Sequence, residues 1–441
     1  MAAGDRLEYG LGWFYDLLTG DEDARVCKDI PDSACNDQPR NFFSYLLANF
    51  LTKISDELVS ARLTLPWLFS ILGIPASFIA FLVPIREAGI LLPQLIVAAY
   101  IRSMQRRKFV WIVGALLSAA ALFLMAVIGY LTEGLFAGWL LIIMLLLYSL
   151  ARGLCSVSAK DVLGKTVSKS RRGRLMGYST ALAGISTIAI GSMMQTDFLG
   201  ETDLTVMLVL LAVAGLVWLL ASAVFVTIAE PEGATEGGGN ALYEAFRSLR
   251  LISDDRSFRQ YLLSRIMLLS VVLVVPFYVM LIQLSLGARP SLLGWLIIIS
   301  GLSQSLSAPL IGFCADRSSR LVMAVASFLA GSIGVLVWLI IELGDASSVS
   351  TLCAMLIFFF INLAYGAARL GRKVYLVDLA TADNRAQYVA VSNSIIGFML
   401  LIGGTIGFAA EVFAVHTIIL ILSIVSLLAG VYILRLKEAS G

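Results

Sequence analysis

Apolar stretches long enough to cross a lipid bilayer recur along the chain from residue 45 to residue 434. The hydrocarbon core of a bilayer is about 30 Å thick, and an α-helix crosses it with roughly 20 apolar residues. The sequence therefore predicts an all-α integral membrane protein with twelve transmembrane helices. The expected spans cover residues 45–68, 78–101, 109–131, 135–158, 175–196, 204–228, 260–283, 290–313, 321–343, 350–368, 387–410 and 414–434.

The composition agrees with a location in the membrane. Of the 441 residues, 59% are hydrophobic and 14% are charged, whereas soluble proteins average about 45–50% apolar and about 25% charged residues. This balance excludes a soluble enzyme and a nucleic-acid-binding protein. The five cysteines are scattered and there is a single histidine, so we expect no disulfide framework, no metal centre and no cofactor.

The first two spans are the least regular part of this pattern. Residues 41–100 contain Pro66, Pro75 and Pro84 as well as several charges. Proline has no backbone N–H to donate, so it kinks or ends helices. We place the turn between these spans at residues 73–75, Gly-Ile-Pro.

The distribution of basic residues predicts the orientation. Most of the 32 Lys and Arg residues follow the even-numbered spans or precede the odd-numbered ones, whereas the opposite loops hold only Arg289. Lys and Arg favour cytoplasmic loops. We therefore expect a multi-pass protein of the cytoplasmic (inner) membrane with both termini in the cytoplasm.

The polar segments divide the chain into five parts. The amino-terminal part has no basic start followed by an apolar run, so no secretory signal is expected; a role for its Cys27 and Cys35 cannot be read from the sequence. A polar, glycine-rich stretch separates the sixth and seventh spans. The parts are a cytoplasmic tail (1–41), a six-helix bundle (42–228), a central loop (229–259), a second six-helix bundle (260–434) and a cytoplasmic tail (435–441).

The two halves resemble each other at an offset of 213 residues. At this offset Lys160 falls on Lys373, Arg172 on Arg385, Ser179 on Ser392 and Gly184 on Gly397. Basic residues are scarce in membrane sequences, so their coincidence indicates duplication. Parallel halves of this kind predict a substrate route at their interface, near the middle of the bilayer.

A motif after the eighth span carries a family resemblance. Residues 312–320 read Gly-Phe-Cys-Ala-Asp-Arg-Ser-Ser-Arg, which resembles the cytoplasmic loop motif of the major facilitator superfamily. The equivalent loop after the second span departs from it, with Ile101 where the family has aspartate. The resemblance implies two pseudo-symmetric six-helix bundles and transport by alternating access. It also implies a gating role for Gly312, Asp316, Arg317 and Arg320, and a role in proton coupling for Arg152 on the fourth span.

Charged residues inside the membrane are concentrated in the first two spans. Each costs about 2.5–3.5 kcal/mol on insertion scales, so such residues are functional candidates. At 100° per residue, Asn49, Lys53, Asp56 and Glu57 share one face of the first span, and Arg86, Glu87 and Gln94 share one face of the second. The alternative is that these charged residues form a structural network of ion pairs without a role in transport. Arg62 is expected to pair or to extend toward the headgroups, and Arg265, near a cytoplasmic helix end, is expected to extend toward the headgroups.

The second half has few charges in the corresponding stretches, and the counterpart of Arg152 is Tyr365. We therefore expect Asp56, Glu57 and Glu87 to exchange protons, with Arg152 facing a carboxylate of the first or second span. Polar candidates for the second half of the pathway are Gln304, Asn362, Tyr365 and Asn393.

These observations predict a monomeric secondary transporter rather than an enzyme, with a small solute, protons and membrane lipid as partners. Residues 366–373 contain two glycines but lack the ending of a phosphate-binding loop, so ATP-driven transport is disfavoured. Two alternatives stay open. One is an exporter of amphipathic compounds or lysolipids, and the other is a sensor or scaffold that acts through its amino-terminal tail without transporting.

Overall fold

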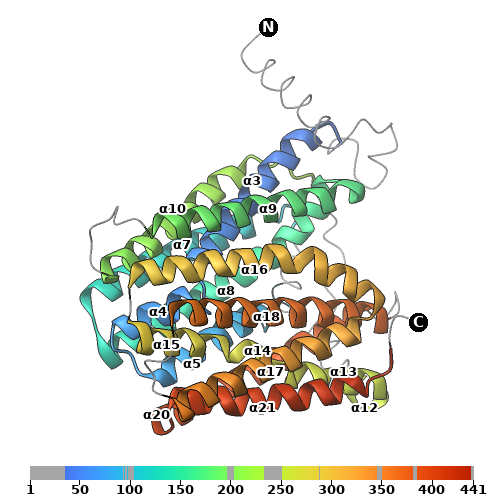
Figure 1. Ribbon diagram of the computed structural model, residues 1–441. Helices are drawn as coiled ribbons and strands as arrows, with labels where there is room; N and C mark the ends of the chain where they lie inside the picture. Colours follow the sequence, from blue (N-terminus) through green and yellow to red (C-terminus); the bar gives the residue numbers. More distant parts are fainter. Residues whose placement is uncertain are drawn as a thin grey trace.

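The computed structural model describes residues 35–92, 94, 97, 104–195, 203–232, 251–287, 289–344, 350–380 and 385–438. In these ranges the protein is built from helices joined by short turns, and no strand is present. The helices lie roughly side by side in Figure 1, with α3, α9 and α10 at the top, α17 and α21 at the bottom, and α4, α8, α16 and α18 between them.

The amino-terminal half contains the following helices: α3 (Gln38–Leu58), α4 (Thr64–Ile71), α5 (Ala76–Leu91), α7 (Lys108–Leu131), α8 (Gly134–Thr166), α9 (Lys169–Met193) and α10 (Asp203–Val226). The carboxyl-terminal half contains α12 (Leu251–Asp254), α13 (Arg256–Met267), α14 (Leu269–Leu273), α15 (Val275–Leu286), α16 (Pro290–Arg317), α17 (Ser319–Leu343), α18 (Thr351–Leu379), α19 (Arg385–Gly404), α20 (Ile406–Val412) and α21 (Val415–Leu434).

Nine helical segments in the described part of the chain are long and apolar enough to cross a membrane. A tenth, shorter apolar segment covers Ser291–Ser305 in α16. The first two predicted spans correspond to α3, which carries several charges, and to α5, which contains Pro84. The all-helical membrane fold predicted from the sequence is therefore confirmed.

Three predicted spans are interrupted rather than continuous. The first changes from α3 to α4 across residues 59–63, the seventh breaks at Leu268 and Val274, and the eleventh breaks at Thr405. Pro276 lies in the first turn of α15, where its missing N–H costs no helical hydrogen bond. The predicted turn after the first span is confirmed, since Gly73 has a φ of 65°, a conformation that glycine adopts without strain.

The halves repeat the same packing. In the first half α7 packs against α8 and α10, and in the second half α17 packs against α18 and α21. Small residues allow close contact between these helices. A Cβ on Gly114 of α7 would lie 2.8 Å from the carbonyl oxygen of Ala151 on α8, so α7 and α8 touch through backbone at this point.

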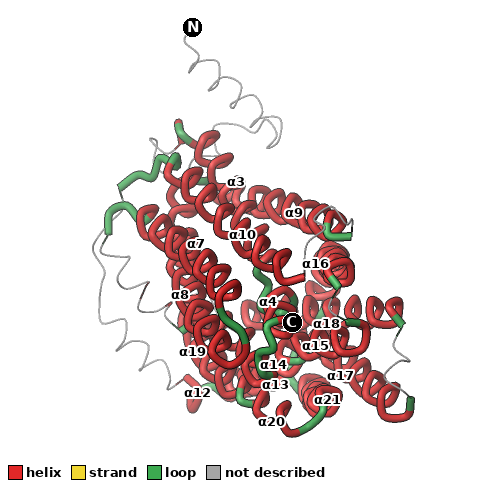
Figure 2. Tube along the Cα trace, turned by 90° about the vertical axis from the view of Figure 1, so that its left-hand side faces the viewer, coloured by secondary structure: helices red, strands yellow, loops and turns green. Residues whose placement is uncertain are grey.

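The two halves contact each other at the end of the molecule where α4 and α15 lie, which is the predicted outer end. Gln283 of α15 donates to the carbonyl oxygen of Trp67 on α4 at 3.3 Å, and Ser77 of α5 hydrogen-bonds Glu411 of α20. In Figure 2 this end faces the viewer, and α4 and α15 lie between the halves. The outer end is therefore closed by contacts between the halves.

Glycines bring α9 and α16 together in the same region. A Cβ on Gly294 of α16 would lie 2.6 Å from the carbonyl oxygen of Gly191 on α9.

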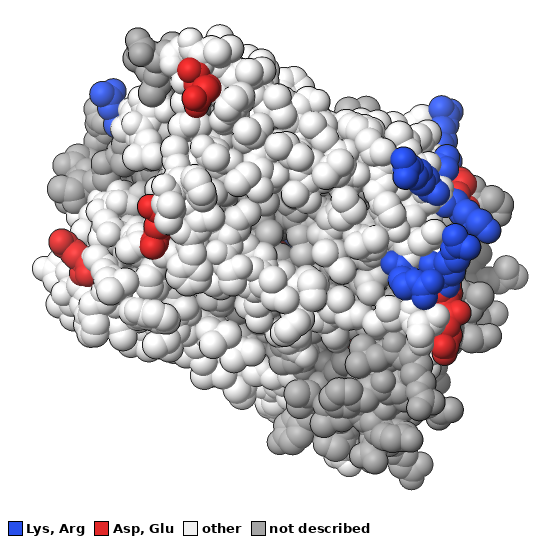
Figure 3. All heavy atoms as spheres, turned by 90° about the horizontal axis from the view of Figure 1, so that it is seen from below, with Lys and Arg blue, Asp and Glu red and all other residues white. Residues whose placement is uncertain are grey.

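On the face of the molecule shown in Figure 3, Lys and Arg gather at one end and most acidic residues lie toward the other. Between them the described residues on this face are uncharged, as expected for a band that faces lipid.

Candidate functional site

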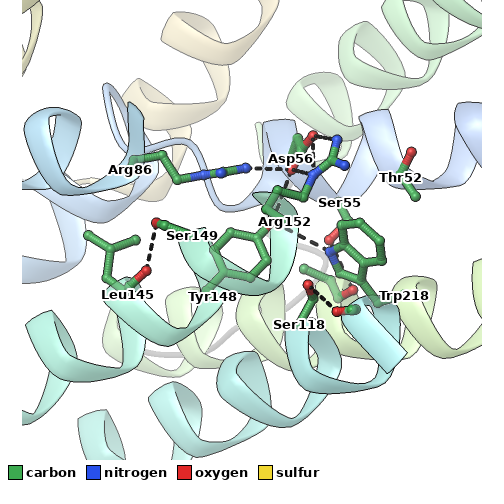
Figure 4. Close-up of polar contacts among 12 residues, drawn as sticks. Thr52, Ser55, Asp56, Arg86, Ser118, Leu145, Tyr148, Ser149, Arg152 and Trp218 are labelled. Atoms are coloured by element: carbon green, nitrogen blue, oxygen red, sulfur yellow. Dashed lines mark hydrogen bonds and ion pairs between the residues drawn. The ribbon is translucent and has the colours of Figure 1, made fainter. Parts of the chain in front are cut away.

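Asp56, near the end of α3, binds two arginines from different helices (Figure 4). Arg152 of α8 donates from Nε to both carboxylate oxygens at 3.1 Å and from Nη2 to Oδ2 at 2.5 Å. Arg86 of α5 donates to Oδ1 at 2.9 Å. A carboxylate of the first span therefore faces Arg152, as the sequence predicts, and one acidic residue joins three helices.

Two aromatic residues complete this cluster, which we call the Asp56 cluster (Asp56, Arg86, Tyr148, Arg152 and Trp218). The hydroxyl of Tyr148 donates to Asp56 Oδ1 at 3.0 Å and accepts from Trp218 Nε1 at 3.4 Å. The guanidinium carbon of Arg86 lies 4.7 Å from the centre of the Tyr148 ring, and that of Arg152 lies 4.9 Å from the Trp218 ring. Cation–π contacts of this kind gain strength where water is excluded.

Glu57, the next residue of α3, interacts with the other half of the protein. It hydrogen-bonds Gln304 of α16 and interacts electrostatically with Arg62 and with Arg369 of α18. Successive helical residues point about 100° apart. Asp56 therefore makes contacts within the amino-terminal half, whereas Glu57 makes contacts between the halves.

Arg62 lies in the break between α3 and α4 and does not extend to the headgroups. Its guanidinium carbon is 4.1 Å from the centre of the Tyr365 ring on α18. Of the two expectations for Arg62, pairing and snorkelling, the structure shows pairing, because the break turns this side chain toward the second half. Tyr365, the repeat counterpart of Arg152, accordingly takes part in a contact between halves.

Lys53 and Arg265 make equivalent contacts in the two halves. Lys53 of α3 hydrogen-bonds Thr180 and Ser179 of α9. Arg265 of α13 donates to Ser392 at 2.5 Å and to Asn393 Oδ1 at 3.0 Å, both on α19. Ser392 is the repeat partner of Ser179.

Arg265 is thus buried, with 7% of its surface exposed, and the expectation that it snorkels is wrong. The same contact corrects the predicted asymmetry between halves. A cation bound to hydroxyl or amide groups occurs in both of them, whereas Asp56 and its arginines belong to the first half alone.

The remaining pathway candidates have varied surroundings. Asn49 donates to Ser179 at 2.7 Å, and Asn362 donates to the carbonyl oxygen of Phe358 in its own helix at 2.8 Å. Glu87 is half-buried and interacts electrostatically with Arg265 and with the basic residues of α18. Gln94 is half-buried.

The predicted gating motif forms the end of α16 and the start of α17. The guanidinium carbon of Arg317 lies 4.5 Å from the centre of the Phe313 ring. Arg320 pairs with Glu438 at 3.2 Å and donates to the carbonyl oxygen of Leu436 at 2.8 Å. Gly312 lies within α16, and the side chain of Asp316 is outside the described part of the structure.

Two functional candidates were missed by the sequence analysis. Arg369 was assigned to a cytoplasmic loop, but α18 continues to Leu379 and places it within the helix. Its spacing of four residues from Tyr365 and from Lys373 is the signal that could have found it. Glu230 has a fully buried side chain that pairs with Lys165 at 3.1 Å and accepts from the amide of Lys108 at 2.7 Å, so it anchors the start of α7.

The described ranges hold no group of three His, Cys, Asp or Glu residues that could bind a metal ion. Cys27 lies outside these ranges. The described side chains form a polar, charged interface inside a membrane protein.

Comparison with known proteins identifies the class of protein. The family model for the Major Facilitator Superfamily matches residues 43–282 and 262–440. The chain belongs to this superfamily and has the fold of its transporters. Among curated proteins, no sequence matches significantly.

Solved structures of transporters share this fold at low sequence identity. A mutant of the nucleoside transporter NupG has a TM-score of 0.69 and 13% identity over 90% of this chain and 100% of its own. A POT family transporter in complex with 5-aminolevulinic acid gives 0.70 and 14% over 93% and 98%. The inward open xylose transporter XylE from E. coli gives 0.65 and 13% over 90% and 96%.

Proposed function

We propose that this protein is a proton-coupled secondary transporter that moves a small solute by alternating access. It acts as a monomer in the cytoplasmic membrane, with both termini in the cytoplasm. The domain boundaries expected from the sequence belong to the same proposal. Among the structural relatives is a D-xylose-proton symporter with a TM-score of 0.68, which supports this class of activity without identifying the solute.

The observation that carries the proposal is the pair of adjacent carboxylates at the end of α3. Asp56 is bound by Arg86 and Arg152 within one half, and Glu57 is bonded to Gln304 in the other. A proton on Glu57 removes its negative charge and so weakens its attraction to Arg369. Proton binding would thereby change a contact between the halves, which is the step that alternating access requires.

The conformation of the described structure corresponds to one state of the proposed transport cycle. Contacts between the halves close the predicted outer end. In this proposal the described structure corresponds to the state in which solute exchanges at the predicted cytoplasmic end. Opening the outer end requires the contacts of α5 with α19 and α20 to separate.

The proposal can be tested with purified protein in proteoliposomes. A thermal-shift screen of sugars, nucleosides, peptides and organic acids would identify a solute, whose uptake is then measured with and without an imposed pH gradient. We expect the parent protein to accumulate the solute against its gradient. Glu57→Gln should lose this accumulation but retain exchange of labelled for unlabelled solute, since exchange requires no net proton movement.

Glu133→Gln is the matched control, because Glu133 is exposed beside the start of α8 at the predicted outer end. It should accumulate solute like the parent. If Glu57→Gln and Glu87→Gln both accumulate the solute as well as the control does, proton coupling through these carboxylates is wrong. A protein that moves no solute but loses its cellular function on deletion of residues 1–41 would instead be a sensor or scaffold.

A further inference from the structure

We propose that the transported solute is a small organic anion, held between Lys160 of α8 and Lys373 of α18. These lysines come from opposite halves and occupy equivalent positions of the internal repeat. Both side chains are exposed, and they interact electrostatically with each other. This inference rests on the proposed transport function and specifies its substrate class.

The two lysines lie at the same depth. Lys160 precedes the last residue of α8, Thr166, by six positions, and Lys373 precedes the last residue of α18, Leu379, by six as well. Each lysine is therefore about 9 Å from the predicted cytoplasmic end of its helix. They form a symmetric pair of cations where a solute would enter from this end.

More cations continue inward along the same helix faces. On α18, Arg369 lies one turn deeper than Lys373 and is likewise exposed. It interacts electrostatically with Lys53 of α3, in the other half. On α8, Arg152 lies two turns deeper than Lys160, in the Asp56 cluster. A row of positive charges thus leads from the entrance toward the middle of the membrane.

The acidic residues of this region do not balance these cations. Asp56 is already bound by two arginines. Glu57 and Glu87 both act on Arg369, and Glu87 also acts on Lys373. Among the described residues, Glu57 and Glu87 are therefore the carboxylates left to act on Arg369 and Lys373, while Lys53 and Lys160 add further positive charge. These residues together carry an excess of positive charge.

This excess bears on the transport cycle. Closing the predicted cytoplasmic end brings Lys160 and Lys373 closer together, and like charges repel one another. A carboxylate or phosphate group between them removes the repulsion and accepts hydrogen bonds from both ammonium groups. The anion would thus favour closure, since a ligand shifts a conformational equilibrium only through its preference for one state.

The test compares anionic solutes with their neutral counterparts. Purified parent protein in nanodiscs is titrated with glutamate and glutamine, succinate and succinamide, glucose 6-phosphate and glucose, and AMP and adenosine, with thermal stability as the readout. We expect stabilisation by at least one anionic member and by none of the neutral ones. Because surface-accessible charges are screened by salt, the Kd of that anion should rise with ionic strength.

Variants assign the binding to the two lysines. Lys160→Gln and Lys373→Gln should each weaken the anion's Kd about tenfold, since hydrogen bonds to charged groups are among the strongest in proteins. Lys373→Arg, which keeps the charge, should retain most of the affinity. The matched control is Lys437→Gln, because Lys437 is an exposed lysine just beyond α21 at the same end of the molecule; its Kd should equal that of the parent.

Each outcome decides the assignment. Equal stabilisation by a neutral counterpart, or no stabilisation by any anion of the set, overturns the anion site. A neutral solute that accumulates under a pH gradient would leave the transporter proposal standing and remove the anion. Anions that bind through both lysines but do not accumulate in proteoliposomes would leave the anion site standing and overturn the transporter proposal. If a variant fails to fold, the paired solutes and the salt dependence of the parent still decide.

Discussion

Arg152 of α8 holds Asp56 of α3 through two nitrogens, with Nε 3.1 Å from both carboxylate oxygens and Nη2 2.5 Å from Oδ2. The planar guanidinium group matches the two oxygens of a carboxylate, which a lysine ammonium group cannot do. The side chains of Asp56 and Arg152 are 26% and 19% exposed. In the interior of the amino-terminal half, Arg152 therefore both neutralises the charge of Asp56 and fixes the orientation of its carboxylate.

Removing one partner of this pair should be costly. Asp56→Asn leaves Arg86 and Arg152 without their carboxylate, and breaking a buried pair typically costs about 3–5 kcal/mol. We expect a lower melting temperature of the purified protein. Asp56→Asn combined with Arg152→Gln should cost less than the sum of the two single changes, which a double-mutant cycle measures. Additive costs would show that the two residues do not depend on each other.

A conservative change separates geometry from charge at the same position. Arg152→Lys keeps the positive charge but loses the two-point contact with Asp56. We expect the melting temperature to stay near that of the parent while the rate of solute transport falls. Arg256→Lys, at an exposed arginine at the start of α13, is the control and should change neither quantity.

Gly294 allows prediction of a conformational shift. A Cβ at this position would lie 2.6 Å from the carbonyl oxygen of Gly191 and 3.0 Å from Met194 Cβ. Gly294→Ala should therefore push α16 away from α9 and open the outer end. Spin labels at Leu131 and Leu343, which lie at the outer ends of α7 and α17, should show a longer distance in a background without native cysteines.

The same helix supplies the control for this variant. A Cβ on Gly312 of α16 would meet no atom within 4 Å. Gly312→Ala should leave the distance distribution as it is in the parent. Identical distributions for Gly294→Ala and Gly312→Ala would mean that the glycine contact does not hold the outer end closed.

Much of the fold could be predicted because the hydrophobic length of a helix is fixed by the bilayer. The contact of Arg152 with a carboxylate of the first span could also be predicted, since a guanidinium group in the membrane needs a partner. The break after Leu58 could not, because hydropathy reports whether a segment is apolar and not whether its helix is continuous. That break places Arg62 against Tyr365.

The positions of Arg369 and Arg265 in the site could not be predicted from the sequence. A charged residue near the end of an apolar stretch gives the same sequence pattern whether the helix ends there or continues. The position of Arg369 became clear only from the extension of α18 to Leu379, and that of Arg265 from its contacts with Ser392 and Asn393 on a distant helix. Both depend on tertiary packing.

The predicted orientation has a direct measurement. A reporter that is active only in the cytoplasm, fused after Gly441, should be active, because the basic residues concentrate in the loops on that side of the membrane. A second fusion after Gly344, following α17 at the predicted outer end, should be inactive. Activity of the Gly344 fusion and not of the Gly441 fusion would reverse the orientation.

Asp255, which precedes α13, gives a prediction for the dependence of stability on pH. Burial raises the pKa of its carboxyl group, but hydrogen bonds from the Tyr388 hydroxyl and from the amides of Phe258 and Ser257 outweigh this effect, so the pKa lies below its ordinary value. A carboxylate with a lowered folded-state pKa stabilises the protein above its unfolded-state pKa of about 3.9. The contribution is lost as the pH falls through the lower, folded-state value.

Two variants separate the charge of Asp255 from its role as the N-cap. Asn is about as good an N-cap as Asp, whereas Ala costs about 1 kcal/mol. The melting temperature of the parent should therefore exceed that of Asp255→Asn at pH 7, and the difference should stay constant down to about pH 5 and shrink below about pH 4. Asp255→Ala should be less stable than Asp255→Asn at every pH. A difference between parent and Asp255→Asn that grows as the pH falls would contradict the lowered pKa of Asp255.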